Sequence, residues 1–200
     1  MLSSEELIEI FDELSKYFVI DAHAEITLEA NPDDLSTEQL IELSGTPINR
    51  LSIGIQSFRD ENLKFLNRIH SSNEAVESVR KAQKAGFENI TIDLIYGIQD
   101  LTNDQWRDNI KMALELGVPH ISCYSLTVEP KTALSSFIQK GKVEPIDPQK
   151  SAEQFEILMD EMKRIGFIHY EISNFCKEGF YSRHNSNYWK GAKYLGLGPS

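Results

Sequence analysis

Cysteine is scarce in this sequence: only Cys123 and Cys176 occur among 200 residues. Two cysteines so far apart are too few for a disulfide-stabilised scaffold, and they do not have the spacing of a zinc knuckle. We therefore expect two buried free thiols. Three closely spaced cysteines, which would indicate an iron–sulfur cluster, are also absent, so we expect no metal site in this chain.

Long apolar runs and positive charge are lacking as well. No run approaches the roughly 20 residues that span a bilayer, and the N-terminus has no basic-then-apolar signal, so we expect a cytoplasmic chain without stable membrane insertion. Acidic residues number 31 against 20 basic ones, which gives a net charge of −11 at pH 7. This charge disfavours binding to phosphate backbones, and nucleic acid is not an expected partner.

The chain does contain alternating strand and helix patterns. Ser or Thr followed three residues later by Glu or Gln predicts four helix starts, after Ser3, Ser36, Ser71 and Thr102, the first helix covering 4–18. A short helix at 59–68 and a long one from 147 to 165 complete the helices, and a loop rich in Pro and Gly covers 129–145. Five strands are predicted, at 25–30, 50–58, 89–96, 121–126 and 168–172.

This alternation predicts an α/β fold with a parallel sheet. An open doubly wound sheet and part of a barrel both fit the pattern, whereas a complete eight-stranded barrel typically takes about 250 residues. The strand at 50–58 is central, because Leu51, Ile53 and Ile55 share one face and neither face is rich in charge. We expect it to be covered on both sides, with Gln56 at its carboxyl end.

Polar residues follow the predicted strands. Ligands of parallel α/β sheets bind at the carboxyl ends of the strands, so these residues are the candidates for a site. They are Glu29, Asn31, Gln56, Ser57, Asp93, Tyr96, Tyr124, Ser125, Thr127, Ser173 and Asn174. Acidic and amide side chains suit ribose hydroxyls and ammonium groups, and Arg68 could bind a carboxylate in a bidentate fork. Taken singly, Glu29 and Arg68 also fit solvated surface residues, and Asp93 fits a cap on a neighbouring turn.

The segment 183–189 combines a basic residue, an imidazole, amides and two aromatic rings in a turn-like stretch. His184 could serve as an axial ligand of a planar macrocycle held between the rings. The alternative is that Tyr188 and Trp189 anchor the C-terminal segment while His184 makes a structural hydrogen bond. The residues alone favour this alternative.

Seven segments together resemble the radical S-adenosylmethionine (SAM) family, in the branch of the oxygen-independent coproporphyrinogen III oxidases and their heme-chaperone relatives. They are EITLEANP (25–32), RLSIGIQSF (50–58), LNRIH (66–70), IDLIYG (92–97), YEISNF (170–175), HNSNYW (184–189) and YLGLG (194–198). The resemblance covers nearly the whole chain, and the forms at 25–32 and 184–189 are more similar to the chaperones.

The resemblance implies a partial (β/α)6 barrel related to the TIM barrel, with a parallel sheet whose first two strands are missing here. The barrel would cover 1–146, and 147–200 would form a C-terminal αβ extension packed on the same domain. In the family, SAM binds beside a [4Fe-4S] cluster and yields a 5′-deoxyadenosyl radical. The residues that match its SAM contacts are Glu29, Gln56, Arg68 and Asp93, with Thr127 and Ile172 as further candidates. His184 matches a motif implicated in heme binding.

The chain departs from the family because the cluster-binding CxxxCxxC loop is missing. We therefore expect part of a longer protein that neither assembles a cluster nor cleaves SAM alone and binds no cofactor tightly. The first function implied is porphyrinogen oxidation in the longer protein, and the alternative is a heme carrier without that activity. An unrelated barrel hydrolase or aldolase ranks last, since no metal-binding histidine set or Schiff-base lysine follows the strands. The unpaired strand 25–30 predicts self-association through its edge.

Overall fold

The computed structural model describes residues 2–198. Its strands are β1 (Thr27–Ala30), β2 (Arg50–Gln56), β3 (Ile90–Tyr96), β4 (His120–Ser125), β5 (Ile168–His169) and β6 (Asn174–Cys176). Its α-helices are α1 (Ser4–Ser15), α2 (Thr37–Ser44), α3 (Asp60–Phe65), α4 (Ser72–Lys84), α5 (Asn103–Glu115), α6 (Ala133–Gln139), α7 (Pro148–Arg164) and α8 (Arg183–Trp189). A short 3-10 helix, η1 (Pro32–Asp34), follows β1.

The six strands form one sheet in the order β1-β2-β3-β4-β6-β5. The pairs from β1 to β4 are parallel, as the alternation predicted, but β6 runs antiparallel to both of its neighbours. The predicted strand at 168–172 is therefore wrong in extent, because the chain turns back after His169 and pairs a second short strand against the first. The expected parallel sheet is therefore confirmed for β1 to β4 and corrected at β6, which is antiparallel to β4 and β5.

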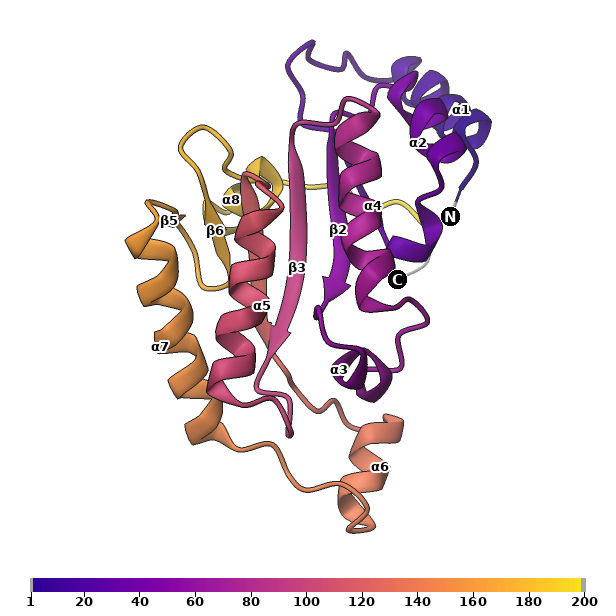
Figure 1. Ribbon diagram of the computed structural model, residues 1–200. Helices are drawn as coiled ribbons and strands as arrows, with labels where there is room; N and C mark the ends of the chain where they lie inside the picture. Colours follow the sequence, from indigo (N-terminus) through magenta and orange to yellow (C-terminus); the bar gives the residue numbers. More distant parts are fainter. Residues whose placement is uncertain (1, 199–200) are drawn as a thin grey trace.

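One face of the sheet is apolar and covered by helices. Leu51, Ile53, Ile55, Ile92 and Leu94 are all fully buried in a single core. Figure 1 shows α4 and α5 lying against this face, with α7 beside α5. The opposite face is lined by polar side chains, yet six of the seven residues of β2 are buried and Ser52 is half-buried, so β2 is covered on both sides, as expected.

Local sequence signals set most helix starts. The capping boxes at Ser3, Ser36, Ser71 and Thr102 are all present, each with reciprocal bonds between the cap and the third helical residue. The first helix ends at Ser15 rather than at residue 18, and Phe18 is exposed. The loop at 129–145 contains α6, which the sequence did not indicate because the helix is short and buries none of its residues.

Buried amide contacts fasten α7 to the rest of the sheet. The backbone carbonyl of Gln154 accepts a hydrogen bond from Trp106 Nε1 at 2.9 Å. Its side-chain Oε1 accepts from Gly97 N and its Nε2 donates to Leu101 O, both at 2.8 Å. Helix α7 thereby packs directly on α5 and on the end of β3. At the other side of the sheet, β1 pairs only with β2 among the residues described. No helix within 2–198 is both long and apolar enough to cross a bilayer.

Candidate functional site

Two adjacent cavities lie on the polar face of the sheet. The first, here called the rim cavity, has a volume of about 380 Å³ and is lined by Glu29, Ala30, Asn31, Asp34, Ser52, Gly54, Gln56, Arg68 and Asp93. It lies at the carboxyl ends of β1 and β2. Four of the residues singled out from the sequence, Glu29, Gln56, Arg68 and Asp93, therefore share one cavity, although they come from three strands and a loop.

Arg68 is fixed at the rim cavity by a chain of polar contacts. Its Nη1 donates to Asn31 Oδ1 at 2.9 Å, and Asn31 Nδ2 donates in turn to Asp34 Oδ2 at 3.2 Å. One Arg68 nitrogen is thereby occupied, and a guanidinium group has further N–H donors. The arrangement fits a cation that is oriented before a ligand arrives.

Gln56 reaches the rim cavity through unusual backbone. It is buried and has a φ of +69°, a value that residues other than glycine rarely adopt. The register between β2 and β3 also shifts between Ile53 and Gln56, as at a β-bulge, and bulges next to functional sites redirect side chains. A Cβ at Gly54 would lie 2.9 Å from Gln56 Nε2. Glycine at this position therefore leaves room for the Gln56 amide.

Asp93 lies between the two cavities and has a perturbed acidity. Burial raises its pKa to about 6, and the charge of Glu29 acts in the same direction. Hydrogen bonds from Ser122 and Ser52 and the charge of Arg50 oppose this shift without cancelling it. A carboxylate held in this way favours ligand groups that donate hydrogen bonds or carry positive charge.

The second cavity, here called the inner cavity, has a volume of about 450 Å³. It is lined by Glu25, Thr27, Glu29, Arg50, Ser52, Asp93, Ser122, Tyr124, Ser182, His184 and Asn185. It shares Glu29, Ser52 and Asp93 with the rim cavity, so a ligand in one cavity would lie beside a ligand in the other. Its wall is strongly polar and carries both signs of charge.

Helix α8 closes one side of the inner cavity. The Glu25 carboxylate accepts hydrogen bonds from Arg183 N at 3.0 and 3.1 Å and from His184 N at 3.3 Å. The turn-like structure predicted for 183–189 is therefore wrong, since Ser182 caps a helix there. The His184 side chain is exposed and lines the cavity, while Trp189 Nε1 donates to Glu171 Oε2 at 3.0 Å.

Sequence reasoning singled out neither Arg50 nor His120 as a site residue. Arg50 is 4% exposed and donates to the hydroxyls of Thr27 and Thr91, while its Nε has no partner among the described residues. His120 is fully buried with Nε2 2.8 Å from the Tyr170 hydroxyl, and burial, aided by the charge of Arg50, lowers its pKa to about 3. Counting back from Gln56 in steps of two would have placed Arg50 on the same face.

Thr127 and Ile172 do not join the other candidates. Thr127 is exposed in the loop after β4, and Ile172 is 66% exposed in the turn between β5 and β6. Neither lines the rim cavity or the inner cavity. Ile172, a candidate from the family resemblance, lies in a turn because β5 ends at His169.

The described residues do not fit an iron–sulfur cluster. No group of three His, Cys, Asp or Glu side chains between residues 2 and 198 could hold a metal ion. Cys123 and Cys176 are both buried free thiols, and burial raises the pKa of both, that of Cys176 to about 11. Buried thiols with raised pKa values are poor metal ligands, because the thiolate is the ligating form.

Known proteins resemble the chain along nearly all of its length. It is 40% identical over 198 residues to the heme chaperone HemW of Bacillus subtilis, covering 98% of this chain and 52% of that protein. It is 34% identical to HemW of Escherichia coli, covering 99% of this chain and 51% of the relative. The chain thus spans about half the length of these curated relatives.

A solved structure shows the same fold. Coproporphyrinogen III oxidase (HemN) from Escherichia coli, a radical SAM enzyme, superposes with a TM-score of 0.75 over 95% of this chain and 43% of its own, at 23% identity. At that identity the likeness concerns the fold alone, an α/β partial barrel with a mostly parallel six-stranded sheet. The model of the radical SAM superfamily matches residues 2–113, more than half of the chain. The chain therefore belongs to the radical SAM superfamily and is similar to the HemW proteins named above.

Proposed function

We propose that the rim cavity is a SAM-binding site. Its support is the convergence of Glu29, Gln56, Arg68 and Asp93 on one cavity, although they are up to 64 positions apart in the sequence (93 − 29). When bound in this superfamily, SAM supplies the 5′-deoxyadenosyl group for radical chemistry. Thr127 and Ile172 are left out of the proposed site because they lie outside the cavity.

Charge complementarity supports this ligand. Carboxylates of Glu29, Asp34 and Asp93 line the rim cavity, and they attract a sulfonium or ammonium group and accept hydrogen bonds from ribose hydroxyls. Arg68 provides the one cationic side chain of the lining and suits the ligand carboxylate. SAM carries all of these groups in one molecule.

The test is binding of SAM to the 200-residue chain, measured by saturation-transfer NMR and equilibrium dialysis. We expect weak binding that Asp93→Asn and Arg68→Gln each reduce about tenfold, since each removes a charge-assisted contact. Arg80→Gln is the matched control, because Arg80 is exposed on α4 and lines neither cavity. Absence of binding, or equal binding by all four chains, would contradict the assignment.

For the wider role, we propose heme carriage in preference to coproporphyrinogen oxidation. The relatives named above are heme chaperones, whereas the oxidase resembles the chain at only 23% identity. The comparisons therefore favour the alternative drawn from the sequence over its first reading. His184, which lines the inner cavity from α8, is the proposed axial ligand.

A heme titration tests this role. We expect a shifted heme absorption band with the wild-type chain and its loss in His184→Ala. His23→Ala is the matched control, since His23 is another exposed histidine and its side chain lines neither cavity. Equal loss in both variants would indicate nonspecific histidine binding and would count against His184.

We also propose that these 200 residues do not cleave SAM on their own. The two buried thiols cannot supply the three thiolates of the family's cluster. After reconstitution with iron and sulfide under reducing conditions, we expect no 5′-deoxyadenosine by chromatography. Its formation would show that other residues can hold a competent cluster.

A further inference from the structure

Gln56 occupies the centre of a γ-turn. Ser57 N donates to Ile55 O at 2.9 Å, a bond that spans one residue, and Gln56 has a φ of +69°. A γ-turn with positive φ is rare and strained, and strained backbone persists only where its surroundings hold it in place. The strain lies at the point where β2 ends and the rim cavity begins.

A buried histidine contacts the acceptor of this turn. His70 Nε2 lies 3.0 Å from Ile55 O, and the His70 side chain is fully buried. Because a carbonyl oxygen only accepts, Nε2 carries the hydrogen and donates it. The other ring nitrogen, Nδ1, lies 3.6 Å from Asp33 Oδ1. Ile55 O thus receives a bond from within the turn and a second from the segment that follows α3.

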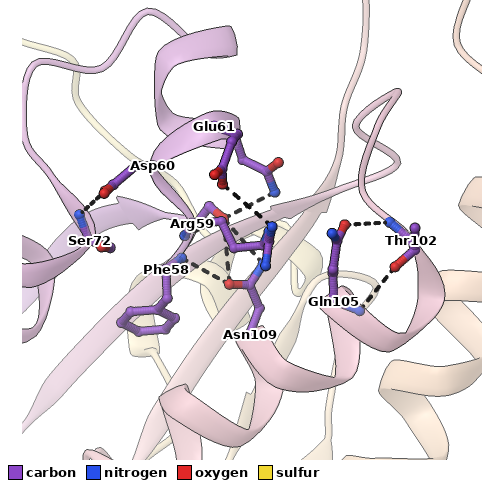
Figure 2. Close-up of polar contacts among 10 residues, drawn as sticks. Phe58, Arg59, Asp60, Glu61, Ser72, Thr102, Gln105 and Asn109 are labelled. Atoms are coloured by element: carbon purple, nitrogen blue, oxygen red, sulfur yellow. Dashed lines mark hydrogen bonds and ion pairs between the residues drawn. The ribbon is translucent and has the colours of Figure 1, made fainter.

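A second set of buried contacts holds the residues after the turn. Ser57 is fully buried, and its Oγ lies 3.2 Å from both Asn62 Nδ2 of α3 and Asn109 Nδ2 of α5. Asn109 Oδ1 accepts a hydrogen bond from Phe58 N at 2.9 Å, as Figure 2 shows. Arg59 N also donates to Ser57 Oγ at 3.2 Å. The segment after Gln56 is therefore bonded to two helices, to α5 through Phe58 N and the Ser57 hydroxyl and to α3 through the Ser57 hydroxyl.

Figure 2 shows that the surroundings of this network are themselves capped. Asp60 Oδ1 accepts from Ser72 N at 2.7 Å, which joins the start of α3 to the start of α4. Thr102 and Gln105 form the capping box at the start of α5, the helix that carries Asn109. Asn109 therefore lies on a helix whose first turn is stabilised by its capping box.

We propose that His70, Ser57 and Asn109 are positioning residues that hold the γ-turn closed and so fix the Gln56 amide in the rim cavity. None of the three lines the rim cavity or the inner cavity, so their effect on a ligand is exerted through Gln56. Burial of such polar groups costs free energy unless they are bonded, and here they bond the strained segment. The ligand part of this inference rests on the proposed SAM site.

The strain is tested by stability alone. With the turn closed, Gln56→Gly is expected to give a higher urea midpoint than Gln56→Ala, because glycine adopts positive φ without cost. In a His70→Leu or Asn109→Leu background the turn can relax, and the difference between the two Gln56 variants is expected to shrink. In a Gln154→Leu background, which loses an equally buried amide that bonds neither the turn nor His70, Ser57 or Asn109, the difference should persist. An unchanged difference in all backgrounds would overturn the inference.

The ligand effect is tested by SAM binding to the same variants. We expect His70→Leu and Asn109→Leu to weaken binding about tenfold, whereas Gln154→Leu binds as wild type once the folded fraction is matched. His70→Gln, which keeps an N–H donor, is expected to restore most of the affinity. Equal binding by wild type and both leucine variants would overturn the positioning role.

The two experiments separate the two claims. If the wild-type chain binds no SAM, the proposed function fails, while the stability comparison still decides whether the network holds the turn. If SAM binds and the stability difference is the same in every background, the proposed function stands and the positioning inference fails.

Discussion

The two faces of the central sheet are made by alternate residues of the same strands, and they differ in almost every physical respect. On the covered face, Leu51, Ile53 and Ile55 are fully buried against helices. On the polar face, Arg50 and Ser52 line the inner cavity with Asp93 from the next strand. A step of one residue along β2 therefore separates a group that stabilises the fold from one suited to bind a ligand.

The buried charged and titratable groups of the polar face lower stability. Burial disfavours the ionised form of Asp93 and the protonated form of His120, and Arg50 keeps a buried guanidinium nitrogen without a partner among the described residues. Such groups are tolerated where function requires them, because hydrophobic burial elsewhere offsets the cost. Substitutions at single residues of each face test this difference.

The largest effect is expected on the covered face. Ile92→Ala removes a fully buried side chain from the core and should lower the free energy of unfolding by about 2–5 kcal/mol, measured by urea denaturation. Ile172→Ala, at an exposed isoleucine, should change it by less than about 0.5 kcal/mol. Similar costs at the two sites would contradict the assignment of the core.

A smaller change in the free energy of unfolding is expected from His120 as the pH falls. Its pKa is about 3 in the folded chain and about 6.5 when unfolded, so stability from this residue is present above pH 6.5 and is lost as the pH falls below it. Between pH 7 and pH 5 the loss should reach about 2 kcal/mol in the wild type. His120→Gln should remove this part of the pH dependence, as measured by denaturation at several pH values.

The contribution of Asp93 to stability should depend on pH in the opposite sense. Its folded pKa of about 6 lies above the ordinary value of 3.8, so its contribution to stability falls as the pH rises from about 4 to 6. A pKa change of this size corresponds to about 3 kcal/mol at pH 7. Asp93→Asn also weakens the hydrogen bonds with Ser122 and Ser52, so it should raise the free energy of unfolding at pH 7 by only about 1 kcal/mol, and this gain should shrink as the pH falls towards 4. A variant that gains stability while binding SAM less well would link the two properties at one residue.

The weakest effect is expected at the edge of the sheet. We propose that β1, which pairs on one side only within the described chain, permits weak self-association. Sedimentation velocity should show a rising average mass between low and high micromolar concentration. A constant monomer mass over that range would contradict this expectation.

Sequence predicts the fold well where the signal is local. The capping boxes at Ser36 and Thr102 depend on residues three positions apart, and both appear where expected. The end of β5 depends instead on pairing with Asn174–Cys176, which alternation within 168–172 cannot reveal. Helix α6 has no buried residue and therefore no apolar stripe to detect.

The site was predictable in part for a similar reason. Gln56 and Asp93 follow from the rule that ligands bind at the carboxyl ends of parallel strands. Arg50 lies at the opposite end of β2, and the rule does not apply to that end. Asn109 lies on a helix and contacts the backbone that follows Gln56. Such residues become visible only when hydrogen bonds between distant segments are known.

The bond between Glu25 and Arg183 joins residues that are 158 positions apart. At a synthesis rate of roughly 5–20 residues per second, the ribosome makes Arg183 roughly 8–30 s after Glu25. During that interval the inner cavity has no α8 beside it, and its wall faces water. That wall carries mainly hydroxyl, carboxylate and guanidinium groups. The incomplete polypeptide therefore exposes no large apolar patch there that would favour aggregation.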